Sequence, residues 1–499
     1  MTEDRKTYRW VRMLTGGVTP FVLAVALLVF VRVYVSACVP GAQEAGICRE
    51  LLAGTTVGRQ ALFGSCWVAP LPVLFYLPFA WIFPEPLAGM GAFFTAWFLV
   101  LWAVREAVKA TGQSGVRIVL AQTAVVGMVM LSPQAQTLGI RTALMTLFML
   151  LGGAALADWA AYRRIRDVVT AGWAGALLAL CGLPAFVSAG VAVGMLPLAA
   201  CGKRESRGRI QAWVLLGGLP LVYTVGVWIL MNRLVLGDPF FFVRSLSYLL
   251  PQPGVFVLAV LGSGLALLPA LIMTWVCDAR TPEAPGAGPV AASAVLISFA
   301  VELLVCGWVL TRFGVGWHVG TLYVAALAVL VVALARLRQS PVRLAVALGL
   351  FVCLSRFWLG GAPVSELSAG AENADADIPR QVEAFVESRT PYGRVFVLGY
   401  AGLDLLRGYT GGRLQPNLDL HVGALRRAYP GQNLYVLVPR PTGAARSESV
   451  FWKYPDLYVL GGDRLLYAAT FGTWRLFEVV TAPTQEQWDE WRRAAESGN

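Results

Sequence analysis

The sequence predicts an α-helical polytopic membrane protein with about 11 transmembrane helices, followed by a small C-terminal α/β domain. Of its 499 residues, 57% are hydrophobic and 14% are charged, whereas about 25% are charged in a typical soluble domain. The hydrophobic residues gather in long blocks, and about 20 of them in a helix cross the hydrocarbon core of a bilayer. Because lipid offers the backbone no hydrogen bonds, each block is expected to be a helix.

Eleven of these blocks are predicted to span the membrane. The first follows a basic N-terminus and is too long for a cleaved signal peptide, so we expect a retained signal-anchor. The predicted spans are residues 18–38, 87–104, 116–131, 142–162, two within the Pro- and Gly-interrupted stretch 168–200, 212–231, 255–276, 290–310, 321–335 and 342–359.

The first outer loop is predicted to cover residues 39–86. Its apolar part contains Pro70, Pro72 and Pro78, and proline at this density disfavours one straight spanning helix. We therefore expect residues 61–83 to form short helices that lie at the membrane surface.

The basic residues predict the orientation. Alternate connectors carry clusters such as Arg163, Arg164 and Arg166, and connectors of this kind stay on the cytoplasmic side. This places the N-terminus in the cytoplasm, and an odd number of spans then places the C-terminal tail outside. The predicted location is the cell inner membrane, with membrane lipids as partners.

The composition changes to a polar one at about residue 361. We expect a membrane domain over residues 1–360 and one extracytoplasmic α/β domain over residues 361–499. In the second domain the pattern predicts helices over 378–388, 418–429 and 485–496, and strands over 394–398, 433–438 and 474–480.

The charge distribution and the motifs of the chain argue against nucleic-acid, nucleotide and metal binding. The net charge of +11 comes from basic residues in short loops, so we expect no nucleic-acid partner. No phosphate-binding loop or dinucleotide fingerprint is present. The two histidines, His318 and His421, and the eight cysteines show no metal-ligand spacing, so no metal or other cofactor is expected. One disulfide could form among Cys38, Cys48 and Cys66, and its pairing stays open.

Carboxylates of the first outer loop are the candidates for catalysis. Glu44 and Glu50 follow the first span, and a carboxylate at the boundary of lipid and water can act as a general base. Glu50 stands beside Arg49, which favours a solvated loop charge. Glu44 is either a general base or a solvated loop charge, and its local sequence favours neither.

Five basic residues of the outer side are candidates for binding phosphate, since guanidinium groups hold phosphate through paired hydrogen bonds. The alternative is that they anchor helix ends to lipid headgroups. They are Arg141, Arg233, Arg244, Arg312 and His318.

Three further charged residues could line a polar cavity. Arg32 lies near the outer end of the first span, where its side chain could also reach the headgroups. Asp238 lies in an outer loop. Glu302 lies inside a predicted span, where a carboxylate needs either a structural partner or a wet cavity.

Four segments resemble the GT-C superfamily of membrane glycosyltransferases, which includes protein mannosyltransferases and lipid A aminoarabinose transferases. The likeness covers most of the chain. It is carried by an acidic first outer loop followed by Leu51-Leu52-Ala-Gly54, by Pro70-Leu-Pro72, by Asn232-Arg233-Leu-Val-Leu-Gly237-Asp238-Pro239-Phe240, and by the tail segments Tyr454-Pro-Asp-Leu-Tyr458 and Trp474-Arg475-Leu-Phe477.

The resemblance implies transfer of a sugar from a polyprenyl-phosphate donor to a glycan, lipid or protein acceptor at the outer face. Glu44 would deprotonate the acceptor, and the outer basic residues would stabilise the departing phosphate. The chain departs from many relatives in the next outer loop. It has Pro133-Gln134-Ala-Gln136 there in place of an acidic residue, so a metal-assisted mechanism is not expected.

Two other functions remain open on the sequence. A transporter or lipid flippase would show repeats and broken helices around a site in mid-membrane, and the interrupted stretch 168–200 is one such break. A non-catalytic membrane scaffold would use its tail domain to bind a partner.

Overall fold

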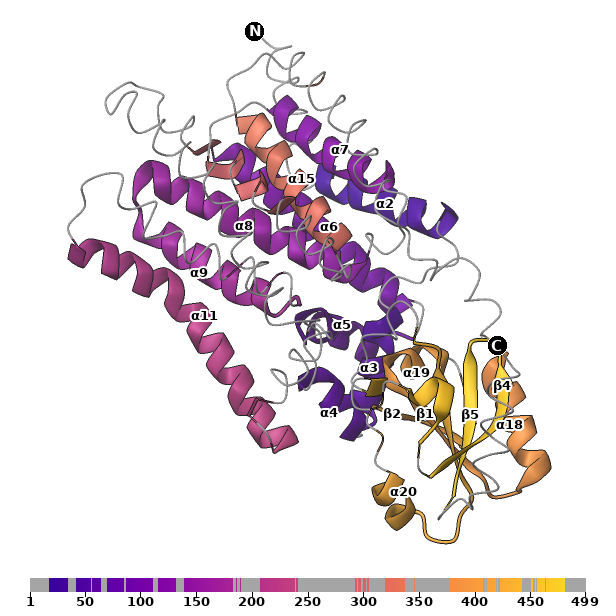
Figure 1. The fold of residues 1–499 in the computed structure, drawn as a ribbon. Coiled ribbons are helices and arrows are strands. Elements are labelled where there is room, and N and C mark those ends of the chain that lie inside the picture. Colours follow the sequence, from indigo (N-terminus) through magenta and orange to yellow (C-terminus); the bar gives the residue numbers. More distant parts are fainter. Residues whose placement is uncertain are drawn as a thin grey trace. The chain divides into compact units, whose positions relative to one another are not determined.

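The structure is a computed structural model, and it divides the chain into two compact units. The helical unit comprises residues 1–41, 65–242 and 250–363, and the sheet unit comprises 42–64, 243–249 and 364–499. Each is described by itself (Figure 1). The described residues are 18–34, 42–54, 56–63, 70–84, 87–110, 115–131, 139–182, 185, 189, 207–237, 239–240, 292–293, 295–297, 299–301, 303–304, 319–336, 345, 377–406, 409, 411–418, 420, 422–441, 450–451, 454, 456–462 and 464–480.

The helical unit is built from eight described helices. Three of them contain a stretch that is long and apolar enough to cross a membrane, namely Leu87–Lys109, Ile140–Trp159 and Gln211–Val235. The helices are α2 (Thr19–Tyr34), α5 (Pro70–Ile82), α6 (Leu87–Lys109), α7 (Gly115–Leu131), α8 (Ile140–Tyr162), α9 (Ile165–Ala179), α11 (Arg207–Leu236) and α15 (Val319–Arg336).

A mostly helical chain with membrane-spanning candidates is therefore confirmed, whereas the count of about 11 spans stays a prediction. Helices α2, α7 and α15 cover other predicted spans but are shorter than the three candidates. Helix α5 has 13 residues, too few to cross a bilayer, which agrees with the short helices expected from the prolines. The predicted spans at 255–276 and 342–359, and most of the one at 290–310, lie outside the described residues.

One end of the helical unit is marked by Arg336, the last residue of α15. Its guanidinium group donates one hydrogen bond to the carbonyl oxygen of Ala107 in α6 and another to the carboxylate of Asp158 in α8. The C-terminal ends of three helices therefore lie together, and we call this the Arg336 end. Helices α9 and α11 run parallel from it, because Trp213 packs near the start of α9, against Val168.

The opposite end is marked by Arg141, in the first turn of α8. The guanidinium group of Arg141 lies within electrostatic range of Cys181. The carbonyl oxygen of Leu180, next to Cys181, accepts a hydrogen bond from the amide of Leu71 in α5. We call this the Arg141 end. The topology of the connectors and the choice of the outer end stay predictions.

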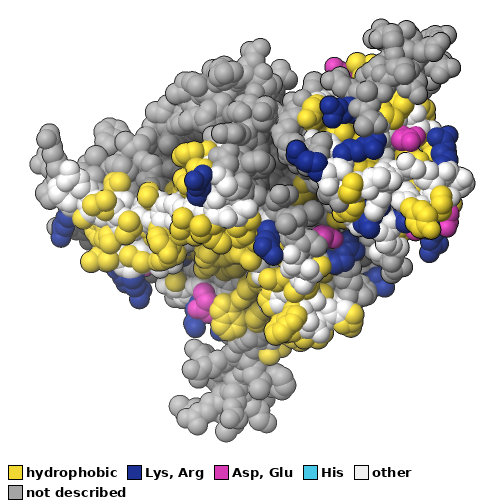
Figure 2. Space-filling view, turned by 90° about the horizontal axis from the view of Figure 1, so that it is seen from below, with side chains coloured by type: hydrophobic (Ala, Val, Ile, Leu, Met, Phe, Trp, Pro, Cys, Tyr) yellow, Lys and Arg dark blue, Asp and Glu magenta, His cyan; other side chains and the backbone are white. Residues whose placement is uncertain are grey.

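The described surface carries large exposed hydrophobic residues, which Figure 2 shows as broad hydrophobic areas. Such a surface is expected to face lipid or protein rather than water. Helix α11 contributes Leu215, Leu219, Val222, Tyr223, Leu230 and Leu234, each at least half exposed.

The sheet unit contains a five-stranded sheet in the order β2-β1-β3-β5-β4. Strands β2, β1 and β3 are parallel, whereas β5 is antiparallel to β3 and β4 is antiparallel to β5. The elements are α18 (Ile378–Arg389), β1 (Arg394–Leu398), α19 (Gly399–Leu405), β2 (Leu414–Asn417), α20 (Val422–Ala428), β3 (Leu434–Pro439), α22 (Leu457–Leu460), β4 (Leu465–Phe471) and β5 (Trp474–Val479).

Alternation along the strands gives the sheet two buried faces. In β1, Val395 and Val397 pack toward α18 and α19, whereas Phe396 and Leu398 join the core on the side of α20 and α22. Period-two alternation of this kind is what a strand buried on both faces requires. The prediction of a small C-terminal α/β domain is thus confirmed.

The predicted elements of this domain are recovered unevenly. Strands β1, β3 and β5 and helix α18 match the predictions to within a residue or two. Strands β2 and β4 are absent from the predictions. They form the edges of the sheet, where one side stays unpaired and the hydrophobic pattern is weaker. The predicted closing helix at 485–496 lies outside the described residues.

Part of the first outer loop belongs to the sheet unit. Helices α3 (Ala42–Leu52) and α4 (Thr56–Phe63) fall within it, and α3 packs against α19. The guanidinium group of Arg49 donates a hydrogen bond to the carbonyl oxygen of Leu406 at 3.4 Å. Helices α3 and α4 of the predicted outer loop therefore make their tertiary contacts within the sheet unit, and the predicted domain boundaries stay a prediction.

Candidate functional site

Helix α3 carries the first candidate residue, and its sequence favours a helix over these residues. Glu44 lies in the first turn and Arg49 in the last turn, and this placement of charges complements the helix dipole. The helix closes where the amide of Gly54 bonds to the carbonyl oxygen of Leu51. Gly54 has a φ of +71°, which glycine adopts without steric cost.

Glu44 is nearly buried, with an exposed fraction of 7%. The following residues Ala45, Ile47 and Cys48 are also buried, so the side of α3 that packs into the sheet unit includes a carboxylate among apolar groups. Among the described residues, its carboxylate makes no hydrogen bond and no ion pair. A carboxylate on a residue with so little exposure is the kind of group for which a functional explanation should be sought.

Helix α4 holds α3 in place through a close backbone approach. A Cβ atom at Gly58 would lie 2.6 Å from the backbone carbon of Glu50, so only glycine fits there. Glu50, the second candidate carboxylate, is half-buried and engaged in other interactions. The two glutamates of α3 thus differ in burial.

Arg141 is the candidate phosphate ligand that the structure buries. It is 6% exposed and lies in the first turn of α8, next to the fully buried Thr142. Thr146, one turn further on, is also fully buried. A guanidinium group carries five N–H donors, which can hold an anion. Arg141 belongs to the helical unit and Glu44 to the sheet unit, so the two are described separately.

Two other expected site residues, Arg233 and Arg32, fall in the described part of the chain, each near the end of a helix. Arg233 is exposed at the end of α11, where it donates a hydrogen bond of 2.7 Å to the carbonyl oxygen of Gly237 and so caps its own helix. Arg32 is exposed near the end of α2. The remaining candidates lie outside the described residues: Asp238, Arg244, Glu302, Arg312 and His318.

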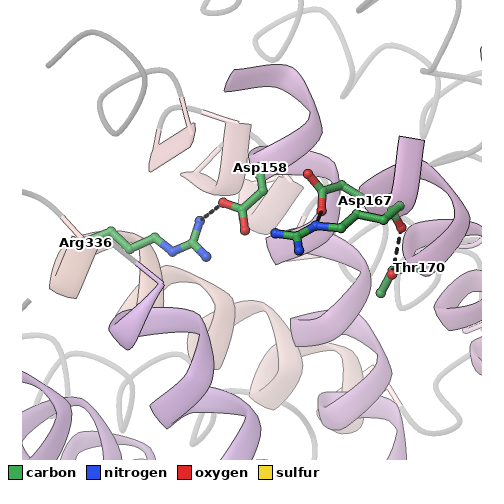
Figure 3. Close-up of polar contacts among 5 residues, drawn as sticks. Asp158, Asp167, Thr170 and Arg336 are labelled. Carbon is green, nitrogen blue, oxygen red and sulfur yellow. Dashed lines mark hydrogen bonds and ion pairs between the residues drawn. The ribbon is translucent and has the colours of Figure 1, made fainter. Parts of the chain in front are cut away.

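The sequence did not predict the pairing of Asp158 with Arg336. The side chain of Arg336 is fully buried, and its Nη1 atom lies 3.0 Å from Oδ1 of Asp158 (Figure 3). The two residues are 178 positions apart, and no pattern in the sequence connects them. The one available signal was a carboxylate near the end of a predicted span, which needs a partner.

The cysteines and carboxylates of the described part of the chain offer no metal site. No group of three or more histidine, cysteine, aspartate or glutamate residues lies together among the described residues. Cys48 and Cys181 are both buried, and neither forms a disulfide in this structure. Cys38 and Cys66 lie outside the described residues.

Comparison with known proteins gives no family assignment. No protein-family model matches the chain, and no curated protein matches it in sequence.

Proposed function

We propose that this chain is an integral membrane glycosyltransferase with Glu44 as its general base. It would transfer a sugar from a polyprenyl-phosphate donor to an acceptor hydroxyl at the outer face of the cell inner membrane. The observation that supports the proposal is the low exposure of Glu44, 7%, on a loop helix that follows an apolar segment.

The reaction requires two groups from the protein, a general base and a cation. The carboxylate of Glu44 takes the proton of the acceptor hydroxyl, whose oxygen forms a bond to the anomeric carbon. The bond from that carbon to the phosphate oxygen breaks, and polyprenyl phosphate leaves with both electrons. A buried guanidinium group such as that of Arg141 would stabilise the developing charge on the phosphate. The other basic candidates, Arg233, Arg244, Arg312 and His318, would assist it from outer loops.

The first prediction concerns Glu44→Gln, which preserves the shape of the side chain and removes the base. In a strain that lacks the gene, we expect the wild-type chain to restore the sugar-modified product and the variant not to do so. General base catalysis contributes about 10² to 10⁴-fold in rate, so the loss should be of that order. Mass spectrometry of surface glycans and lipid-linked sugars measures both the product and the unused donor.

Glu50→Gln is the matched comparison, because it makes the same change on the same helix. We expect this variant to retain most of the transfer activity, since Glu50 already makes other interactions. If Glu44→Gln and the wild type give equal product at equal amounts of protein in the membrane, the role of Glu44 is refuted. Unchanged glycan and lipid profiles on deletion of the gene would refute sugar transfer altogether.

A reaction in detergent separates an enzyme from a transporter or flippase. A detergent micelle does not separate two compartments, so a transporter forms no sugar–acceptor product there. A transferase still joins the sugar to the acceptor. If the protein is a non-catalytic scaffold, Glu44→Gln should leave the amount of sugar-modified product unchanged in both assays.

A further inference from the structure

Arginine side chains lie over aromatic rings at the Arg336 end of the helical unit. In each case the central carbon of the guanidinium group is within 5 Å of the ring centroid. The pairs are Arg105 over Trp102 at 4.7 Å, Arg163 over Trp159 at 4.4 Å and Arg164 over Tyr162 at 4.9 Å. Such contacts restrict the guanidinium groups to few orientations.

The carboxylates at this end already have cationic partners. Asp158 pairs with Arg336 at 3.0 Å, Asp167 pairs with Arg166 at 3.3 Å, and Glu106 pairs with Arg105. Figure 3 shows the first two pairs. Arg164 and Lys109 are exposed and bring further positive charge, so the described surface at this end is electropositive.

The turn between α8 and α9 lies at a boundary of apolar and polar surface. The candidate membrane-spanning stretch of α8 ends at Trp159, and Ile165 just beyond it is 62% exposed. The side chain of Arg166 is 74% exposed. Trp173, two turns into α9, is 50% exposed. Exposed aromatic and aliphatic side chains beside arginines are typical of the headgroup region of a bilayer.

The backbone of this turn takes a conformation that is unusual for arginine. Arg163 has a φ of +54°, and its amide closes α8 by bonding to the carbonyl oxygen of Trp159 at 2.7 Å. A left-handed conformation is sterically unfavourable for a non-glycine residue. The conformation allows α9 to start at Ile165, so that Arg164 and Arg166 flank an exposed apolar side chain in one short turn.

We propose that residues 162–166 form a binding site for the phosphate headgroup of an anionic phospholipid. The exposed guanidinium groups of Arg164 and Arg166 hold the phosphate through charge-assisted hydrogen bonds. Arg166 does so through its Nη atoms, since its Nε atom donates to Asp167. The ring of Tyr162 orients Arg164. Ile165 and Trp173 contact the acyl chains. The adjoining apolar surface favours a lipid over a soluble phosphate compound, which would gain nothing from it. The inference does not depend on sugar transfer.

The experiment measures lipid binding to the full-length chain purified in detergent. Native mass spectrometry follows the titration with phosphatidylglycerol or with zwitterionic phosphatidylcholine. For Arg164→Gln with Arg166→Gln, we expect the affinity for phosphatidylglycerol to fall about tenfold to thirtyfold, since each basic residue near an anionic surface contributes about a factor of five. The affinity for phosphatidylcholine should not change.

The matched control is Arg380→Gln with Arg389→Gln in α18, which removes the same charge from the sheet unit. Arg389 also lies over a ring, that of Phe385, at 4.5 Å, so the control removes one pair of the same geometry. Equal affinity of the two double variants for phosphatidylglycerol would overturn the proposal, as would an equal loss for both lipids.

Two further measurements keep the test independent of the folding of the double variant. Tyr162→Phe retains the ring beneath Arg164 and should bind phosphatidylglycerol as the wild type does, whereas Tyr162→Leu should bind it several-fold more weakly. Wild-type binding must also weaken as salt is raised. Salt-independent binding, or identical behaviour of the two Tyr162 variants, contradicts the site.

Discussion

At the scale of single residues, burial decides which charges matter. Arg336 is fully buried, and Asp158 with 27% exposure of its side chain is its anionic partner. The pair also ties α15 to α6 through the carbonyl oxygen of Ala107, at 2.9 Å. Removing one member of a buried pair costs much more than the pair itself contributes, because the remaining charge loses its compensation.

Asp158→Asn is therefore expected to destabilise the helical unit by about 1 to 3 kcal/mol, less than the full cost of breaking a buried pair because Asp158 is partly exposed. Thermal unfolding of the detergent-solubilised protein should show a lower Tm. Glu387→Gln is the control, since it breaks the exposed pair between Glu387 and Arg413, for which less than about 1 kcal/mol is expected. Equal Tm shifts for the two variants would contradict the role of burial.

At the scale of elements, helices α9 and α11 approach each other closely. A Cβ atom at Gly172 would lie 2.6 Å from the carbonyl oxygen of Gly217. Small residues at such a crossing let two backbones approach closely, which is the usual way that helices pack within membranes. The crossing is parallel, and Trp213 packs on Trp159 and Val168 one turn nearer the Arg336 end.

Gly172→Ala should force these helices apart and cost about 1 to 3 kcal/mol, the usual range for overpacking. Gly226→Ala is the matched control on α11, because a Cβ atom there meets nothing within 4 Å. This control should be neutral or stabilise by up to about 1 kcal/mol. The measurement is the Tm of the two variants in detergent. A Gly172→Ala protein as stable as the Gly226→Ala control would refute the close approach of the helices.

At the scale of the whole molecule, the chain builds its sheet unit from distant parts of the sequence. Helices α3 and α4 come from the loop after the first apolar helix, yet α3 packs on α19 of the C-terminal domain. The candidate base is therefore positioned by residues more than 300 positions away, through contacts such as that of Arg49 with Leu406.

Deletion of residues 364–499 should therefore expose α3. Cys48, which is buried on α3, reports on this through its rate of alkylation, measured by peptide mass spectrometry. We expect alkylation to be at least tenfold faster in the truncated chain, since the thiol loses its cover. Cys181 in the helical unit is the internal control and should stay slow. A slow Cys48 in a truncated chain that retains a slow Cys181 would disprove the packing.

The predictions from sequence were most accurate where hydrophobic patterns are strongest. Helices α6, α8 and α11 and strands β1, β3 and β5 were predicted because long apolar blocks and tight alternation depend only on nearby residues. Edge strand β2 was missed, since its sequence Leu-Gln-Pro-Asn has no alternation. Of the candidate site, the sequence named Glu44 and Arg141 but could not tell that both are buried, because burial depends on what packs over a side chain.

The sequence by itself determined the class of the protein and the small C-terminal sheet domain, because the transfer of apolar residues out of water is set by composition and spacing alone. The tertiary structure decided three further things: the pairing of Arg336 with Asp158, the approach of α9 to α11, and the place of α3 in the sheet unit. Each depends on contacts between residues far apart in the chain. Local propensity cannot specify such contacts, since many pairings satisfy the same pattern and only close packing selects one of them.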